Sequence, residues 1–216
     1  MAQVFQVQPE TPQIRVMDQI VNELKRGAVM LYPTDTVYAI GCDLNNKEGQ
    51  ERIRAMRNHP EKKPLTFIAQ SISNIADYAH VADKAYKVMR RLTPGPYTFL
   101  LPASKLVPKL VSNSKRTTVG IRIPDHPICQ SLVGILENPL ISMSARLPEN
   151  QDPITLDELF EQFEKKVDII IDDETNFYRS PYTGLVSTMI DFTGEDPQIV
   201  REGLGFELAE EELLWP

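Results

Sequence analysis

The chain is organised around a stretch that reads Leu31-Tyr32-Pro33-Thr34-Asp35-Thr36-Val37-Tyr38-Ala39-Ile40-Gly41-Cys42-Asp43. It begins in a short apolar run, from Ala28 to Tyr32, whose length and composition are typical of a buried strand. Pro33 has no backbone N–H to donate, so we expect the strand to end there. The next three residues, Thr34 to Thr36, are compact donors and acceptors. These residue types alone fit either an ordinary turn or a small polar ligand site at a strand end.

Composition limits the class of protein. The 216 residues fit one domain, and the 42% of hydrophobic and 25% of charged residues are ordinary values for a soluble chain. The formal net charge of -7 argues against a surface coated in basic residues for non-specific nucleic-acid binding, although it is compatible with a local basic cleft. Cys42 and Cys129 match no zinc or C-x-x-C spacing, so we expect two reduced, buried thiols.

Targeting signals are not evident in the sequence. Residues 1–13 have neither the basic region nor the apolar region of a secretory signal. No run approaches eighteen consecutive apolar residues, so no membrane span is predicted. We therefore expect a cytoplasmic protein with no membrane partner.

Helical and strand patterns alternate along the chain. Thr11 and Pro12 predict the start of a first helix, as cap and first-turn proline, and Gly27 predicts its end. Further helices are predicted at residues 47–57, 71–78, 82–92, 125–136 and 155–163, the last with a Thr155 capping box. Strands are predicted at residues 28–32, 65–69, 97–101, 117–123, 140–144, 167–171, 186–191 and 198–201.

This alternation predicts a layered α/β fold around one sheet of about seven strands. Some connections are too short for a crossover helix, so we expect a mixed sheet. No linker interrupts the chain, and we expect residues 1–216 to form a single domain. The acidic tail, residues 207–216, is expected to be a solvated helix or a frayed end.

Several familiar catalytic signatures are absent. The sequence contains no G-x-S-x-G, no H-E-x-x-H, no Walker loop and no G-x-G-x-x-G. The three histidines, His59, His80 and His126, are scattered, and residue type alone favours surface or turn positions for them. Asp172-Asp173-Glu174 is interpreted as a solvated turn after a strand rather than as a cation site.

Hydroxyl and basic side chains instead gather at predicted strand ends. The hydroxyl residues are Thr36, Thr93, Thr118, Ser142, Ser144, Ser187 and Thr188. The basic residues between them are Arg57, Lys62, Lys63, Lys115, Arg116, Arg122, Arg146 and Arg201. Ligands of open α/β sheets collect at strand ends, where charge-assisted bonds from Arg and Lys suit phosphate or carboxylate. As a set, these residues favour an anionic small molecule.

Arg122 illustrates the argument from strand alternation. Val119, Ile121 and Ile123 share one face of a predicted strand, so Arg122 points to the other face, with Thr118 and Gly120. A full charge on an inner strand needs a partner or a ligand. We expect Arg122 to bind the carboxylate of a substrate.

Six further blocks follow the opening stretch along the chain. They are Lys63-Pro64-Leu65, Thr93-Pro94-Gly95-Pro96-Tyr97-Thr98, Thr118-Val119-Gly120-Ile121-Arg122-Ile123-Pro124-Asp125-His126-Pro127, Ser142-Met143-Ser144-Ala145, Val186-Ser187-Thr188-Met189-Ile190-Asp191 and Val200-Arg201-Glu202-Gly203. In this order, and over nearly the whole chain, the opening stretch and these blocks resemble the YrdC-like threonylcarbamoyl-AMP synthase family. The resemblance implies the family's twisted mixed sheet flanked by helices.

The resemblance also implies an activity. The family joins L-threonine and bicarbonate into a carbamate and adenylates it with ATP, accompanied by Mg²⁺, and the product serves to modify the adenosine beside the anticodon of certain tRNAs. Arg57 and Lys63 resemble its catalytic residues. Thr36, Arg122 and Ser187 resemble its threonine contacts. The nucleotide contacts implied are His59, Thr118, Ser142, Ser144, Arg146 and Arg201, and no protein metal ligand is implied.

Three departures from the family pattern qualify this expectation. Arg57-Asn58-His59 stands where K-x-R is usual, Ser144-Ala145-Arg146 where S-A-N is usual, and Tyr38-Ala39-Ile40-Gly41 where Y-G-L-G is usual. They make the chain look closer to the YciO branch. The leading hypothesis is a synthase-like enzyme whose activity these departures would weaken. The alternative is a paralogue that binds a nucleotide, double-stranded RNA or tRNA without this chemistry.

Arg146 yields the first prediction. Asparagine offers a donor and an acceptor, whereas Arg146 offers only donors, in a planar fork suited to phosphate. A charge-assisted contact contributes about 1.5–3 kcal/mol. Arg146→Asn is therefore expected to weaken ATP binding about tenfold or more while raising the rate of adenylate formation, as measured by titration and by pyrophosphate release. Unchanged ATP affinity would show that Arg146 points away from the ligand.

Overall fold

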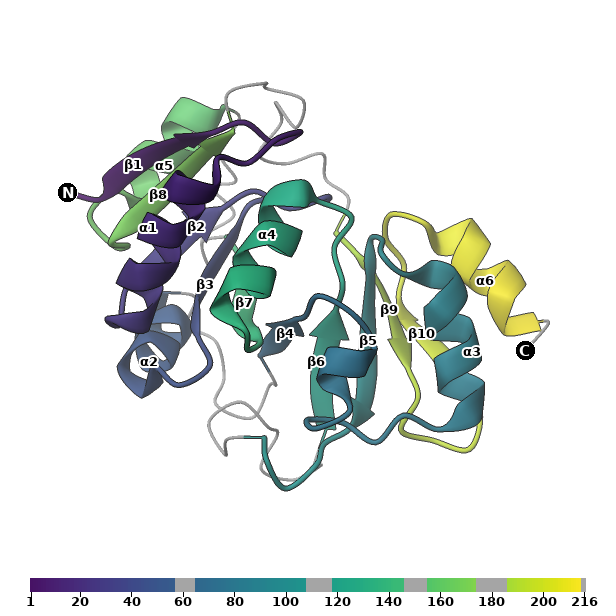
Figure 1. The fold of residues 1–216 in the computed structure, drawn as a ribbon. Coiled ribbons are helices and arrows are strands. Elements are labelled where there is room, and N and C mark those ends of the chain that lie inside the picture. Colours follow the sequence, from purple (N-terminus) through teal and green to yellow (C-terminus); the bar gives the residue numbers. More distant parts are fainter. Residues whose placement is uncertain (57–64, 108–117, 146–154, 174–185, 215–216) are drawn as a thin grey trace.

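One twisted sheet with helices on both faces forms the core of the structure (Figure 1). The structure, a computed structural model, describes residues 1–56, 65–107, 118–145, 155–173 and 186–214. Its strands are β1 Gln3–Val7, β2 Val29–Tyr32, β3 Ala39–Asp43, β4 Thr66–Ile68, β5 Tyr97–Pro102, β6 Thr118–Arg122, β7 Leu140–Ser144, β8 Ile169–Asp173, β9 Thr188–Asp191 and β10 Gln198–Arg201. Its α-helices are α1 Ile14–Lys25, α2 Lys47–Met56, α3 Asp83–Leu92, α4 Pro127–Leu136, α5 Leu156–Phe163 and α6 Phe206–Leu214.

The sheet is mixed, as the short connections predict. Its order is β1-β8-β2-β3-β7-β4-β6-β5-β9-β10. It contains parallel pairs, such as β4 with β6 and β5 with β9, and antiparallel pairs, such as β3 with β7 and β5 with β6. The predicted α/β class is confirmed, but the sheet has 10 strands rather than about seven.

The sequence patterns missed β1 and β3. Glutamine residues interrupt β1, which forms because it pairs in parallel with β8. β3 contains Ala39 and Gly41, which are weak strand formers and lie in the part of the opening stretch for which no strand was predicted. Pairing on both sides, with β2 and with β7, makes this segment a strand.

Two apolar layers hold the helices against the sheet. On one face, α1 and α4 pack together against the strands through side chains such as Met17, Leu132 and Ile171. On the other face, α2, α3 and α5 cover a larger cluster built on residues such as Phe67 and Phe99. Because α1 and α4 cover only one end of their face, the strands β4, β6, β5 and β9 carry a stretch that these two helices do not cover.

Local start and stop signals were predicted with mixed success. The capping box at Thr155 is confirmed, since the Glu158 N–H donates to Thr155 Oγ1 at 3.2 Å. The predicted start of α1 at Thr11 and Pro12 is wrong, because the N-cap is Gln13 and its side chain makes no capping bond. For the tail, the described part forms the helix α6.

Two predicted segments take a different form. Residues 71–78 form only a short 3₁₀ turn, Ser73–Ile75, instead of a helix. The chain is drawn away by pairing, because Ala79 bridges Ala103 and the His80 N–H donates to the Pro102 carbonyl at 2.8 Å. The alternating pattern of residues 117–123 is typical of a strand with one buried face, but β6 is buried on both faces from Val119 to Arg122.

The predictions for the two cysteines are confirmed, whereas the prediction for the acidic residues after β8 begins is wrong. Cys42 and Cys129 are buried free thiols, as expected, and burial raises the pKa of Cys42 to about 12. Asp172 and Asp173 belong to β8, and Asp173 is 1% exposed, so the interpretation as a solvated turn is wrong for these two residues. In the described part of the chain, no helix is both long and apolar enough to cross a membrane.

His126 corrects a further expectation. It is fully buried at the N-cap of α4, whereas the sequence favoured a surface or turn position; His80 is exposed, as predicted. Burial, together with the nearby Arg122 charge, lowers the pKa of His126 from 6.5 to about 4. The imidazole is therefore neutral in the folded protein at pH 7.

This pKa shift predicts a pH-dependent loss of stability. Between pH 6.5 and 4 the unfolded chain binds a proton that the folded chain does not, so the free energy of unfolding falls as the pH falls through this window. The contribution of His126 is expected to be about 2 kcal/mol between pH 7 and pH 5. Denaturant unfolding of the wild type and of His126→Gln at both pH values measures it.

The variant provides the control, because carboxylates contribute equally to both proteins. The His126→Gln protein should lose less stability than the wild type on acidification, whatever its stability at pH 7. Parallel losses in the two proteins would contradict the assignment.

Candidate functional site

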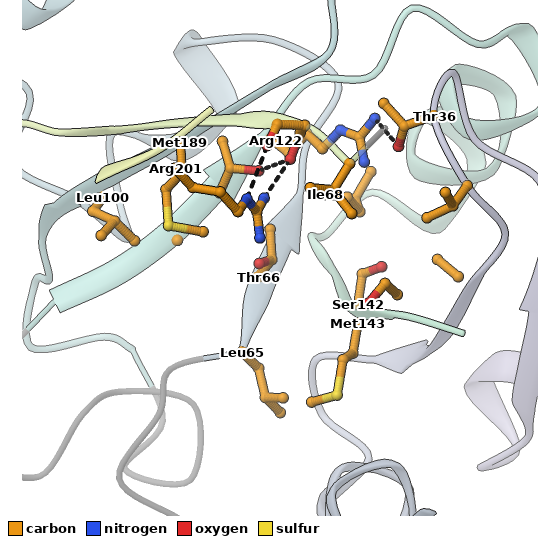
Figure 2. A pocket seen from close by; sticks show the side chains of 17 residues that line it. Thr36, Leu65, Thr66, Ile68, Leu100, Arg122, Ser142, Met143, Met189 and Arg201 are labelled. Atoms are coloured by element: carbon orange, nitrogen blue, oxygen red, sulfur yellow. Dashed lines mark hydrogen bonds between the residues drawn. The ribbon is translucent and has the colours of Figure 1, made fainter. Parts of the chain in front are cut away.

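A cavity of about 450 Å³ lies over the centre of the sheet (Figure 2). Its described lining residues come from strands β3 to β7, β9 and β10 and from the segments beside them. They are Thr36, Val37, Ala39, Leu65, Thr66, Ile68, Thr98, Leu100, Gly120, Arg122, Ser142, Met143, Ser144, Val186, Ser187, Met189 and Arg201. Segments distant in the sequence therefore meet at one site.

Strand register explains the floor of the cavity. Thr66 on β4 lies opposite Ser142 on β7 and Gly120 on β6, and Gly120 lies opposite Leu100 on β5. Residues directly opposite one another point to the same face of a sheet, so these four side-chain positions form one row. Gly120 adds no side chain to this row and so leaves space above the sheet. A Cβ at this position would lie 3.3 Å from Thr66 Oγ1, which is a tight contact.

A second row ends at Arg201. Thr98 on β5 lies opposite Met189 on β9, and Met189 lies opposite Arg201 on β10. The register of β10 shifts between Ile199 and Arg201, which is how Arg201 comes to face Met189. Such a bulge re-aims the following side chain, here onto the face that lines the cavity.

The lining is positively charged and rich in hydroxyls. Its described residues include two arginines, Arg122 and Arg201, and no carboxylate. Figure 2 shows the two guanidinium groups set apart, Arg122 beside Thr36 and Arg201 near Thr66. Six lining residues bear hydroxyl groups, namely Thr36, Thr66, Thr98, Ser142, Ser144 and Ser187. Together with apolar neighbours such as Leu100, this lining suits an anion that also carries an apolar part.

Arg122 is held by the loop that follows β2. Its Nη2 donates to an Asp35 carboxylate oxygen and, at 2.8 Å, to Thr36 Oγ1. The other Asp35 oxygen accepts from the Asp125 N–H at 3.1 Å. Both charged side chains are nearly buried, with 10% and 8% exposed. Arg122 Nε, by contrast, is buried and has no hydrogen-bond acceptor among the residues that the structure describes.

Ser187 and Arg201 form a second polar group. Arg201 Nε donates to the Ser187 carbonyl at 3.0 Å, and Arg201 Nη2 donates to Ser187 Oγ at 2.8 Å. Thr98 Oγ1 lies 2.8 Å from the same serine oxygen. These bonds fix the guanidinium of Arg201 although it sits on an exposed edge strand.

Most of the described residues predicted from sequence do meet at this site. Six of them line the cavity: Thr36, Arg122, Ser142, Ser144, Ser187 and Arg201. Thr118 begins β6 but does not line the cavity. Arg57, His59, Lys63 and Arg146 lie outside the described residues, and their roles stay predictions.

Three residues that contribute to the site were not predicted from the sequence. Asp35 lies inside the opening motif, but nothing in the sequence connects it to Arg122. Thr98 follows Thr93-Pro94-Gly95-Pro96-Tyr97 in a quoted block, so its place after a strand start was the available signal. Thr66 and Phe67 are neighbours on β4, so their side chains point to opposite faces of the sheet. Which of the two points to the cavity follows only from the pairing of β4 with β6.

A protein-held metal receives no support. In the described ranges, no group of three or more His, Cys, Asp or Glu side chains is placed to hold a metal ion. The Asp35 carboxylate, which contacts the lining residue Arg122, is already engaged in that ion pair.

Comparisons with known proteins find related sequences and structures. The family model Sua5_yciO_yrdC, described as "Telomere recombination", matches residues 22–203. The uncharacterized protein YciO of Escherichia coli K12 is 37% identical over 210 residues, covering 95% of this chain and 97% of that protein. A threonylcarbamoyl-AMP synthase of Vibrio vulnificus is 32% identical over 158 residues, covering 72% and 84%.

Solved structures give the same relationship. The crystal structure of E. coli YciO matches with a TM-score of 0.85 and 36% identity, covering 94% of this chain and 97% of that one. The crystal structure of P. abyssi Sua5 complexed with L-threonine matches with a TM-score of 0.86 and 27% identity, covering 98% of this chain and 61% of that one.

The Asp35–Arg122 ion pair provides a test of the site's architecture. Removing one partner of a buried pair leaves an uncompensated charge and costs about 3–5 kcal/mol. Arg122→Ala should therefore lower the free energy of unfolding by about this amount, as measured by denaturant titration. If Arg122 contacted only a ligand, its substitution would leave the stability of the ligand-free protein unchanged.

A double-mutant cycle supplies the control. Asp35→Asn combined with Arg122→Gln removes both charges, so the double variant should lose less stability than the sum of the single variants. Additive losses would show that the two side chains do not interact.

Proposed function

The chain belongs to the Sua5/YciO/YrdC family, and we propose that it is a threonylcarbamoyl-AMP synthase-like nucleotidyltransferase acting on ATP, L-threonine and bicarbonate. The observation that carries this proposal is the cavity in which two fixed arginines stand apart over a floor of hydroxyls. Its product would feed the threonylcarbamoyl modification of adenosine in tRNA.

The proposed reaction has two bond-forming steps. The threonine nitrogen forms a bond to the carbon of bicarbonate, with loss of water, and gives a carbamate. A carbamate oxygen then attacks the α-phosphorus of ATP, and the bond from that phosphorus to the bridging oxygen breaks to release pyrophosphate. Both steps join anionic groups, so the site must hold negative charges close together and in the right orientation.

Arg122 suits the carboxylate of the amino acid. Its Nη2 is engaged by Asp35 and Thr36, which fixes the guanidinium plane, while its Nε has no acceptor among the described residues. A buried donor of this kind gains most from a charged acceptor. Thr36 and Ser187 line the same cavity and complete the proposed threonine side. A relative with this fold, P. abyssi Sua5, was crystallised with L-threonine.

Arg201 suits the phosphate chain of the nucleotide. Its guanidinium is oriented by Ser187 before any ligand binds, which lowers the entropy lost on binding. Ser142 and Ser144 offer hydroxyls from strand β7, and apolar residues such as Leu100 and Met189 offer a surface for a less polar part of the ligand. Developing charge on phosphoryl oxygens would then meet fixed donors and a cation.

Mg²⁺ fits the proposal only as a companion of ATP. The described lining holds no carboxylate, so an ion would be bound mainly by phosphate oxygens and water. When bound, it would neutralise part of the charge on the phosphates. The residues of this chain would still bind and orient the reactants.

Pyrophosphate release tests the function directly. Pure protein incubated with ATP, Mg²⁺, threonine and bicarbonate should release pyrophosphate and form the adenylate, and leaving out threonine should abolish both. ATP binding without any product, at high enzyme concentration and with verified folding, would sink the enzyme hypothesis. It would favour instead the nucleotide-binding paralogue, whose RNA affinity would fall steeply with salt.

Arg201→Ala tests the assignment of the phosphate side. Loss of one charge-assisted contact, about 1.5–3 kcal/mol, should weaken ATP binding about tenfold or more. Arg90→Ala is the matched control, because Arg90 is an exposed arginine on α3 outside the cavity and its loss changes the net charge equally. Equal effects of the two substitutions on the titration would mean that only overall charge matters.

A further inference from the structure

Tyr32 contacts a residue that lines the cavity, across a neighbouring strand. It is the last residue of β2, it is fully buried, and its hydroxyl lies 2.5 Å from Ser142 Oγ on β7. β2 and β7 are not adjacent, because β3 lies between them. The ring therefore spans β3 to contact a residue that lines the cavity.

Gly41 makes this crossing feasible. It lies on β3, opposite Ser142 on one side and Met30 on the other. A Cβ at position 41 would lie 2.9 Å from Tyr32 Cε1 and 2.9 Å from the Ile141 carbonyl oxygen. Such distances are shorter than a carbon side chain tolerates, so only glycine leaves room for the ring. The opening motif thus contains both the tyrosine and the gap through which it passes.

The direction of the hydrogen bond follows from the number of protons. The Tyr32 hydroxyl has one proton, and Ser142 is its hydrogen-bond partner among the described residues. Burial raises the pKa of Tyr32 well above its ordinary value, so the hydroxyl stays protonated. If Tyr32 accepted from Ser142, its own buried O–H would have no acceptor, which is the costlier arrangement. Tyr32 therefore donates, and the Ser142 proton is left for the cavity.

We propose that Tyr32 is a positioning residue that acts through Ser142, fixing the serine hydroxyl as a donor to a phosphoryl oxygen of the bound nucleotide. This inference rests on the proposed function, because it names the group that Ser142 contacts. The two lining arginines make an anionic acceptor the fitting partner for that proton. A serine hydroxyl fixed in advance loses less rotational freedom when the ligand binds.

The test is a double-mutant cycle on ATP affinity. Tyr32→Phe keeps the ring and removes only the hydroxyl, and it should weaken ATP binding about three- to tenfold. Ser142→Ala should weaken binding at least as much. In the Ser142→Ala background, Tyr32→Phe should cause no further loss, because its effect passes through the serine.

A matched variant separates positioning from general stability. The Tyr97 hydroxyl also donates a bond, part-buried, to the Gly205 carbonyl at 3.2 Å, but Tyr97 does not line the cavity. Tyr97→Phe should lower the melting temperature about as much as Tyr32→Phe does, with ATP affinity unchanged. Equal weakening of ATP binding by Tyr32→Phe with and without Ser142 would overturn the proposal.

ATP binding and pyrophosphate release are measured separately, so that the proposed enzyme activity and the proposed role of Tyr32 can each be refuted without the other. A wild type that binds ATP but releases no pyrophosphate would refute the proposed enzyme activity, while the double-mutant cycle on ATP affinity could still be measured. Normal turnover with an additive cycle would refute the role of Tyr32 alone. No ATP binding by the wild type would overturn both.

Discussion

The buried ion pair between Asp35 and Arg122 is the interaction on which the site depends. It joins residues 87 positions apart in the sequence, from the loop after β2 and from the end of β6. The same carboxylate also accepts from the Asp125 N–H, so one side chain fixes the loop, the strand and the segment that leads into α4. Taking two charges out of water is costly, and the added bonds from Thr36 and Asp125 offset part of that cost. Once Nη2 is held in this way, Arg122 Nε stays buried without a hydrogen-bond acceptor among the residues that the structure describes.

The second constraint is geometric and comes from the sheet. α1 and α4 cover one end of a face of the 10-stranded sheet, and small residues keep the adjacent part of that face low. Thr66, Gly120 and Ser142 stand side by side there because of the strand register. Polar groups on such a floor would be costly if they were unsatisfied, but many bond to each other, as Ser187 does to Arg201 and Thr98. The cavity is therefore a consequence of pairing order as much as of any single motif.

The sequence predicted the face of the sheet to which a side chain points better than it predicted the residue that the side chain contacts. Alternation along β6 placed Arg122 on the correct face, and the hydroxyls at strand ends pointed to the region that forms the cavity. Alternation carries no information on which distant residue lies opposite, so Asp35 was missed as the partner of Arg122. The strand β3 was missed for a related reason. Its alanine and glycine are weak strand formers, and pairing with two neighbours overrides that local preference.

The burial of His126 could not be predicted from the local sequence either. Nothing local marks it as a core residue, because a histidine before Pro127 is typical of a helix entrance near the surface. It becomes fully buried because α4 packs back against the sheet beside Arg122. A neutral imidazole next to a guanidinium adds no second positive charge, whereas a protonated one would repel Arg122. Burial of His126 therefore keeps Arg122 as the cation at this end of the described cavity lining, with Arg201 at a distance from it. On the proposed function, this separation would let the carboxylate of one substrate and the phosphates of the other bind to different arginines, with the reacting atoms between them.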